Sequence, residues 1–493
     1  MKDESKFSKV LSILLSVVLV ISSFYLLYQV IRLNVLPSKF LFPLTIGVVV
    51  LDAIFILLLI YFSKNVVSKI VCILLTLFIC VASCMGGYYI SKTQNVLSNI
   101  TNVAKHAKNT VSVIVKESSS IKNKSQLNGV SVGSLRLNEQ GSKKVLKELS
   151  SEGIVLNQTE YDSMTALLEA FYNGEVDSII INESSRSQIL DMETYSNFDS
   201  NTRVVYQTSY KVKNNDSATS VSDITSKPFN VLISGSDTRG GFDENGRSDV
   251  IMIATVNPKT HTILLTSVPR DFYVTTACDA GDGCMQGALD KITHTGIHGT
   301  NTTKRTVEQL LGIEINYTFK VGFDTVTELV DVLGGVDVYV EPGYATTTSE
   351  FSVHEGVNHL NAEQALAFAR ERYSYTEGDR QRTKNQQQVL MGIVKEATKP
   401  SVITNYAAIM DTMANTFSTT MSNAEITDLI KYQLNNNPTW KMEQYMVDGT
   451  GDTLMCAELG DAASVMVPDQ STVKMAKDKI NAVLAGKSSE DVK

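Results

Sequence analysis

Three short apolar stretches decide the fold of the C-terminal half: residues 229–234 (FNVLIS), 249–256 (DVIMIATV) and 262–268 (TILLTSV). Apolar runs of this length, rich in β-branched residues and bounded by turn residues, are typical of buried strands. The turn signal NPKT at 257–260 predicts that the last two strands form an antiparallel pair. We assume that the first two strands are also antiparallel neighbours, across residues 235–248.

Under this strand order, charged side chains collect at one edge of the sheet. One residue follows the first strand, two precede the second, and one follows the third. In chain order they are Asp237, Arg247, Asp249 and Arg270. Two carboxylates and two guanidinium groups are therefore expected to lie together.

A second polar set follows on two predicted helices. Asn361 and Gln364 form a capping box for the first helix, which runs into Arg370 and Arg372. The second helix begins after Gly378. Its positions 379, 382, 386, 390 and 393 share one face, and because the C-terminal part of this stripe is apolar, we expect the polar part to point into the core as well. The polar members of the stripe are Asp379, Arg382 and Gln386.

Arginines so far apart in the chain favour a multiply charged ligand, because planar guanidinium groups match phosphate oxygens bidentately. Two neighbouring aspartates suit Mg²⁺ (or Mn²⁺), which is usually held by one or two carboxylates together with substrate phosphates. The residues therefore predict a site for a metal-bound pyrophosphate. The alternative is an ion-pair network in which the arginines only neutralise the carboxylates.

The 493-residue chain begins with a basic, apolar segment. Residues 1–90 hold seven Lys/Arg and three Asp/Glu, so the remainder carries a net charge of −12, which argues against binding of duplex nucleic acid through the overall field. Three apolar runs, 10–31, 40–62 and 70–90, are long enough to cross a bilayer. A cleaved signal peptide is the alternative for the first run, but two further spans follow promptly.

The basic residues also predict the topology of this anchor. The N-terminal tail and the second loop carry more Lys/Arg than the first loop, so we expect the N-terminus in the cytoplasm and the region after the third span outside. Asp52, in the second span, is either functional or a packing contact. Outside the cytoplasm, Cys278 and Cys284 could close a disulfide, or they remain two free thiols.

The expected domains are an anchor (1–92), an accessory domain with its linker (93–226), a catalytic domain (227–475) and a tail (476–493). After a polar stretch at 95–128, extended segments, among them 153–156, alternate with helical ones up to residue 182, as in a small α/β unit. Residues 170–180 resemble a stretch of extracellular solute-binding proteins, but the unit shows no catalytic set. A spacer, regulatory or partner-binding module is therefore expected.

The motifs of the C-terminal half resemble those of the LytR–CpsA–Psr family. The opening matches lie at 234–240, 247–252, 256–260 and 268–271, and further matches lie at 290–294, 307–312, 334–336, 367–372 and 378–382. The three-span anchor and accessory module look like the capsule-locus branch of this family in streptococci and their relatives.

This resemblance implies a mixed α/β protein with an α/β/α sandwich domain outside the cell membrane. Such proteins bind polyprenyl-pyrophosphate-linked glycans and transfer the glycan phosphate to peptidoglycan. The partners implied are the lipid-linked glycan, the peptidoglycan acceptor, the membrane and other capsule-locus membrane proteins, with no nucleic acid.

The resemblance also implies roles for individual residues. Asp237 and Asp249 would hold Mg²⁺, and Asp379 and Gln386 would support the arginines that clamp the pyrophosphate. Those arginines would be Arg247, Arg270, Arg370, Arg372 and Arg382. Of the whole set, Arg247, Arg270, Asp379 and Arg382 are predicted to be catalytic.

Three other functions stay open from the sequence. One is a non-enzymatic regulator that binds the lipid-linked precursor and controls capsule synthesis. Another is a polyprenyl pyrophosphatase that passes the phosphate to water. Transcriptional control is the third, and the predicted outward topology opposes it.

Overall fold

The computed structural model describes residues 6–62, 65–103, 106–213, 217–236, 244–279, 283–399, 402, 408–409, 412 and 417–493. The chain divides into two compact units. The first contains Met1–Asn99, Thr398–Ala414 and Ser422–Pro438, and the second contains Ile100–Ala397, Asn415–Met421 and Thr439–Lys493.

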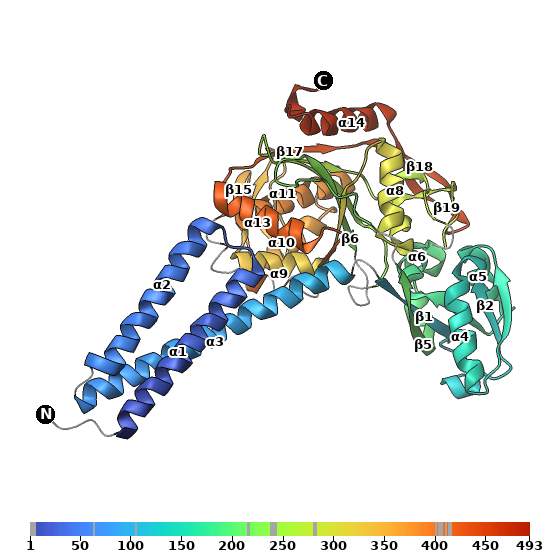
Figure 1. Cartoon of the computed structure of the whole chain (residues 1–493). Coiled ribbons are helices and arrows are strands. Elements are labelled where there is room, and N and C mark those ends of the chain that lie inside the picture. The colour runs from blue at the N-terminus through green and yellow to red at the C-terminus, as the bar shows by residue number, and fades with distance from the viewer. Residues whose placement is uncertain are drawn as a thin grey trace. The chain divides into compact units, whose positions relative to one another are not determined.

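Three long apolar helices dominate the first unit (Figure 1). They are α1 (Lys6–Leu33), α2 (Ser38–Leu57), which continues as a π-helical turn (Leu58–Phe62), and α3 (Val66–Val103). Each is long and apolar enough to cross a membrane, over Lys9–Leu33, Ser38–Phe62 and Val66–Gln94. The three predicted spans are confirmed as helices. The third helix runs eleven residues beyond the boundary predicted at residue 92.

Two hydrogen bonds show how Asp52 and a further helix are held in this unit. Ser23 on α1 donates a hydrogen bond to Asp52 on α2 over 2.9 Å, which gives Asp52 a helix-packing role. Helix α13 (Asn423–Asn436) meets the α1–α2 connection, where Lys431 Nζ donates to Asn34 Oδ1 over 2.7 Å.

The accessory domain has a five-stranded sheet of order β3-β2-β4-β1-β5. Strands β2, β3 and β4 are parallel, and β1 pairs antiparallel with β4 and β5. The helix α4 packs on one face and α5 on the other. The strands are β1 (His106–Lys116), β2 (Ser131–Leu135), β3 (Asn157–Tyr161), β4 (Ser178–Asn182) and β5 (Thr202–Lys213). The helices are α4 (Glu139–Ser151), α5 (Met164–Asn173), α6 (Arg186–Asp191) and α7 (Phe198–Asn201), with short 3₁₀ turns at Lys124–Gln126, Arg136–Asn138, Glu183–Ser185 and Glu193–Tyr195.

The α/β character predicted for this domain is confirmed, but two details were wrong. The stretch 95–128 is not simply a polar connection, because it contains β1, whose Val111, Val113 and Ile114 are fully buried. The extended segment predicted at 153–156 lies later, as β3, because Gly153 ends the turn after α4.

The large sheet has the order β16-β11-β6-β7-β8-β17. Strand β7 pairs antiparallel with both β6 and β8, which confirms the strand order assumed from the sequence. Strands β11 and β17 run parallel to β6 and β8, and β16 is antiparallel to β11. The strands are β6 (Phe229–Ser236), β7 (Val250–Asn257), β8 (Thr262–Ser267), β11 (Tyr317–Gly322), β16 (Phe417–Thr419) and β17 (Lys441–Met446).

Helices cover this sheet on both sides (Figure 1). On one side, α8 (Thr300–Leu311) and α14 (Gln470–Leu484) form a core with β6, β7 and β8 that includes Leu232, Ile253 and Leu264. On the other side, α11 (Asp379–Ala397) crosses β8 and β17 and packs with α9 (Phe323–Leu333) and α10 (Ala362–Arg370). The α/β fold class is therefore confirmed.

The boundary predicted at residue 475 does not hold. Ala476, Ile480 and Val483 of α14 are fully buried in the sheet's core, so residues 476–484 belong to the domain and not to a tail. Residues 423–436, predicted as part of the same domain, group with the anchor unit.

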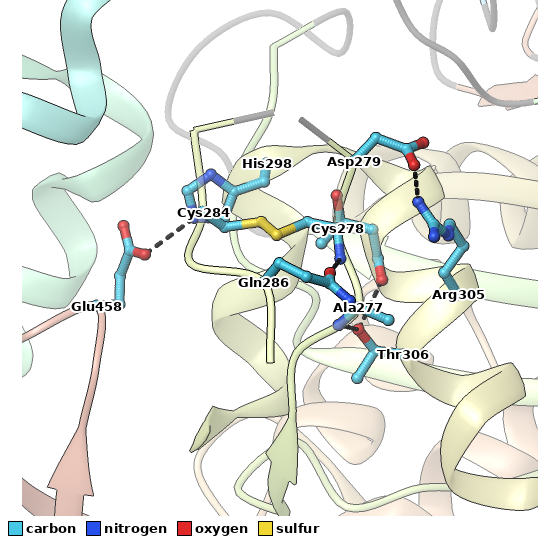
Figure 2. Close-up of a disulfide and its surroundings, with 10 residues drawn as sticks. Ala277, Cys278, Asp279, Cys284, Gln286, His298, Arg305, Thr306 and Glu458 are labelled. Atoms are coloured by element: carbon cyan, nitrogen blue, oxygen red, sulfur yellow. Dashed lines mark hydrogen bonds and ion pairs between the residues drawn. A yellow bond between two sulfur atoms is a disulfide. The ribbon is translucent and has the colours of Figure 1, made fainter. Parts of the chain in front are cut away.

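Small antiparallel pairs complete the second unit. They join β9 (Tyr273–Thr275) to β10 (Leu289–Lys291), β12 (Val336–Val340) to β15 (Gly356–Leu360), β13 (Thr346–Thr347) to β14 (Ser352–Val353), and β18 (Gly449–Cys456) to β19 (Asp461–Pro468). Two 3₁₀ turns lie at Ile292–His298 and Ser489–Asp491. Of the two alternatives left open for Cys278 and Cys284, the structure has the disulfide (Figure 2).

Candidate active site

The segment that leads into β7 is held rigidly at the sheet edge. Ser248 lies within hydrogen-bond distance of Ser234 (2.9 Å between the two Oγ atoms) and of Thr303 (3.1 Å), and its amide donates to Thr293 O. The amide of Asp249 donates to Gly235 O over 2.8 Å. These bonds fix the backbone on both sides of Ser248, and so they position Arg247 and Asp249.

Asp249 lies between two arginines. Arg270 Nη1 donates to Asp249 Oδ1 over 2.7 Å, and Arg247 Nη2 lies 3.9 Å from Asp249 Oδ2. Arg270 follows β8, where Pro269 cannot donate to the ladder and ends the strand. All three side chains are at least four-fifths buried. The sheet edge predicted from the sequence thus exists for these three residues.

Helix α11 supplies the next pair. Gly378 has a φ of +54°, a conformation that favours glycine, and it lets the chain turn into the helix directly before Asp379. Arg382 Nη2 lies 2.5 Å from Asp379 Oδ1 and its side chain is only 12% exposed. The positive charges of Arg270 and Arg372 act on Arg382, and the charge of Asp379 acts on Arg270. Both predicted sets therefore form one cluster.

The two central arginines differ in how well their charges are compensated. Burial by itself would lower the pKa of Arg270, but Asp249, Asp271 and Asp379 raise it well above its ordinary value. Burial and the nearby charge of Arg270 lower the pKa of Arg382, and its carboxylate neighbours do not compensate. Arg382 is therefore the less well compensated of the two arginines, chiefly because it is buried.

Two buried donors also lack a protein acceptor. Within the described ranges, the Nε–H groups of Arg270 and Arg382 are buried and have no hydrogen-bond partner. A buried donor without a partner is costly, so these atoms fit an oxyanion that completes the site. In a simple ion-pair network we would expect these donors to be paired.

The other residues predicted for the site are Arg370, Arg372, Gln386 and Asp237. Arg372 donates from Nη2 to Tyr373 Oη over 2.6 Å, beside a tyrosine that is 85% exposed. Arg370 is exposed at the end of α10, and Gln386 is partly buried one turn after Arg382. Asp237 lies outside the described residues. The binding roles of Arg370, Gln386 and Asp237 stay predictions.

The inward stripe predicted for α11 was wrong in detail. The buried positions are Gln381, Thr383, Asn385, Gln387, Val389 and Gly392, and the positions 382, 386, 390 and 393 are only partly buried. The reason is that polar residues bind main-chain atoms inside the domain. Asn385 Nδ2 donates to Phe368 O over 3.0 Å. Such contacts leave no apolar signal in the sequence.

Sequence reasoning missed two acidic residues of the site. Asp271 lies 3.8 Å from Arg270 Nε and 3.3 Å from Lys291 Nζ, and its position next to Arg270 was an available signal. Asp191, at the end of α6 in the accessory domain, forms an ion pair with Arg247. No local pattern could have indicated this contact, because 56 residues separate the two.

The carboxylate oxygens of the site are suitable metal ligands for a hard cation, but they are too few to bind it alone. Asp249 offers carboxylate oxygens, as Mg²⁺ prefers, next to arginines that would hold its phosphate partners. Among the residues that the structure describes, no group of three or more His, Cys, Asp or Glu side chains could hold a metal. The residues thus fit a cation that takes most of its ligands from substrate and water.

Comparison with known proteins places this site in a family. The profile of the LytR_cpsA_psr family matches residues 194–482, more than half of the chain. The polyisoprenyl-teichoic acid–peptidoglycan teichoic acid transferase TagU of Bacillus cereus (strain AH820) is 33% identical over 207 residues, 42% of this chain and 65% of that protein. TagU of Bacillus subtilis (strain 168) is 35% identical over 196 residues, 40% of this chain and 60% of that protein. The match thus spans less than two thirds of these relatives.

Solved structures are also similar. The crystal structure of B. subtilis TagU aligns with a TM-score of 0.41 and 28% identity, over 52% of this chain and 97% of that one. The protein gbs0355 from Streptococcus agalactiae aligns with a TM-score of 0.45 and 25% identity, over 53% and 89%. On the strength of the profile match, which contains the whole arginine cluster, this chain belongs to the LytR_cpsA_psr family.

Proposed function

We propose that this chain is a membrane-anchored glycan phosphotransferase that moves a glycan from a polyprenyl-pyrophosphate carrier to peptidoglycan. The observation that carries the proposal is geometric: the buried Nε–H groups of Arg270 and Arg382 have no hydrogen-bond partner among the described residues. A pyrophosphate would accept from these Nε–H groups. The TagU relatives are named as transferases of teichoic acid to peptidoglycan, which supports the same reaction class.

In the proposed reaction, a peptidoglycan sugar hydroxyl attacks the glycan-side phosphorus. The bond from this phosphorus to the bridging oxygen breaks, and polyprenyl monophosphate leaves with the bond's electron pair. Arg247, Arg270 and Arg382 would stabilise the charge on the transferring phosphoryl group, which is the main form of catalysis in such reactions. The hydroxyl proton passes to Asp249, Asp379 or a substrate phosphate oxygen, because guanidinium groups stay protonated.

Asp249, together with Asp237, would hold Mg²⁺ or Mn²⁺ against the substrate phosphates. A bound cation of this kind neutralises phosphate charge as it develops. Arg370, Arg372 and Gln386 would extend the clamp on the pyrophosphate.

The membrane setting follows from the anchor. We infer that the N-terminus lies in the cytoplasm and that the region after α3 lies outside, where lipid-linked glycans and peptidoglycan meet. The anchor and accessory domain resemble the capsule-locus branch, so we propose capsular polysaccharide as the glycan transferred. A reporter fused after Lys493 should be active outside the cell; activity in the cytoplasm would contradict this topology and the reaction.

The test is a transfer assay with the full chain in detergent, polyprenyl-pyrophosphate-linked glycan, peptidoglycan and Mg²⁺. We expect lipid monophosphate to be released and the glycan phosphate to become bound to peptidoglycan, with loss of both after EDTA treatment or in Arg382→Gln. Arg380→Gln is the matched control, because this arginine lies on the same helix but pairs with Asp448 (2.7 Å). Binding without release would favour the precursor-binding regulator, and release of soluble glycan phosphate would favour the pyrophosphatase.

A further inference from the structure

A cavity of about 320 Å³ lies between the accessory domain and the segment that leads into the arginine cluster. Its accessory wall includes Asn109 on β1, Asn138 before α4 and Tyr210 on β5, and its opposite wall includes Asn245 and Asn301. This volume is within the range of small-ligand pockets, about 300–1,000 Å³. None of these residues belongs to the arginine cluster.

The lining is unusually rich in carboxamides. Asn109, Asn138, Asn182, Asn245 and Asn301 all line the cavity. A carboxamide donates and accepts at once, as a sugar hydroxyl does, so an array of amides is complementary to a hydroxylated, uncharged ligand.

Charged residues of the same lining already have partners. Arg136 Nη1 lies 2.6 Å from Asp162 Oδ1, and His298 Nε2 lies 3.0 Å from Glu458 Oε2. The cavity is therefore poorly suited to an anion or a cation and well suited to a neutral polar molecule.

Several polar atoms that line the cavity have, within the described part of the chain, no hydrogen-bond partner or only a distant one. Asn138 is 91% buried, and its Nδ2 has no partner among the described residues; the same holds for Asn109 Oδ1. Tyr210 Oη meets Asn109 Nδ2 and Asn182 Oδ1 only at 3.5 Å each, the outer limit of a hydrogen bond. Buried polar groups normally find partners, so this wall is arranged for a ligand.

The disulfide borders another side of the cavity. Cys284 is bonded to Cys278, and both Gly283 and Cys284 line the cavity. Gly283 has a φ of +85°, and a Cβ there would lie 3.3 Å from Leu137 O, so the loop approaches the accessory domain closely. Figure 2 shows His298 beside this disulfide and directed towards Glu458.

We propose that this cavity binds one or two uncharged sugar units of a glycan substrate. Asn245 in its wall is two residues from Arg247 in the cluster, at most about 7 Å along the chain. A glycan whose phosphate lies on Arg247 can therefore reach the cavity with its nearby sugars. The assignment to a substrate glycan rests on the proposed function, whereas the sugar specificity rests on the cavity alone. The sugar comes either from the carrier-linked glycan or from peptidoglycan.

Calorimetric titration of the full chain in detergent tests this proposal with two probes. One is a tetrasaccharide of N-acetylglucosamine, the uncharged sugar of peptidoglycan, and the other is an uncharged oligosaccharide fragment of the wall-linked glycan of the producing strain. Asn138→Ala and Asn301→Ala should each weaken binding about fivefold, as expected for one lost neutral hydrogen bond. Asn173→Ala, an exposed asparagine of the same domain outside the cavity, should bind like the wild type.

The outcomes separate the possibilities. Binding of the tetrasaccharide assigns the cavity to the acceptor, and binding of the wall-glycan fragment assigns it to the donor. No heat with either probe at millimolar concentration, or equal affinity in both variants and the wild type, would overturn the proposal. Arg382→Gln should keep the sugar affinity while losing lipid monophosphate release, so failure of the transferase reaction is recognised independently. Circular dichroism checks that each variant folds, and Asn301→Ala, at a half-buried position, remains informative if Asn138→Ala does not fold.

Discussion

Replacing Arg270 by glutamine should destabilise the protein strongly, whereas replacing Arg382 by glutamine should hardly change its stability. Arg270 is compensated, because it donates to the buried Asp249 over 2.7 Å and carboxylates raise its pKa. Arg382 is not compensated, because burial and Arg270 lower its pKa. Both arginines nevertheless belong to the proposed pyrophosphate clamp.

The expected magnitudes follow from these environments. Arg270→Gln leaves the Asp249 carboxylate buried without its close partner, and breaking such a pair costs about 3–5 kcal/mol. At about 2–4 °C per kcal/mol, the melting temperature should fall by about 6–20 °C. Arg382→Gln loses its pair with the partly exposed Asp379 but is relieved of burial and repulsion, so the free energy of unfolding should change by less than about 1 kcal/mol. Lipid monophosphate release should fall about 10²–10³-fold in both variants.

Thermal unfolding of the full chain in detergent, followed by circular dichroism, gives the stability readout, and the transfer assay gives the activity. Inorganic pyrophosphate should raise the melting temperature of the wild type more than that of Arg382→Gln, since a ligand stabilises in proportion to its affinity for the folded state. Arg380→Gln should leave both readouts nearly unchanged. If Arg382→Gln lowered the melting temperature as much as Arg270→Gln and kept full activity, the cluster would be a structural ion-pair network and the reasoning would fail.

Three further predictions concern stability. Burial raises the pKa of Glu443, but hydrogen bonds, the strongest of them from Lys441, outweigh burial and lower the pKa from 4.5 to about 2. The stability that the ionised Glu443 contributes is therefore complete above pH 4.5 and should be lost as the pH falls towards 2. Glu443→Gln should remove this pH dependence from acid unfolding curves between pH 4.5 and 2. The double variant Cys278→Ser, Cys284→Ser removes a disulfide that joins residues six apart in the sequence. The free energy of unfolding, measured with chemical denaturant, should fall by about 2 kcal/mol. An unchanged denaturant midpoint would contradict a bonded pair. Gln387 Nε2 donates to Tyr445 O (2.8 Å) and Leu265 O (3.3 Å); Gln387→Leu should cost about 1–3 kcal/mol, and an unaltered melting temperature would show that these bonds do not join α11 to the sheet.

Much of the architecture was predictable from short-range patterns. The three spans, the antiparallel strands from residue 229 onwards and the Asp249–Arg270 edge all follow from apolar runs and turn residues close in sequence. Strand β1 was missed because polar residues surround its buried core. The buried face of α11 was misassigned because Gln381 and Asn385 occupy it, and a hydrophobic pattern does not register buried amides.

The sequence by itself determined the elements, the membrane anchor and the residue types at the sheet edge, because hydrophobic periodicity and turn chemistry act over a few residues. Only the tertiary structure decided which arginine is compensated and which is not, because the burial and charge around Arg270 and Arg382 come from segments far apart in the chain. The amide-lined cavity is likewise a product of the fold, since its asparagines come from positions as distant as 109 and 301. Electrostatic fields and cavities depend on distances in space, which a linear pattern does not contain.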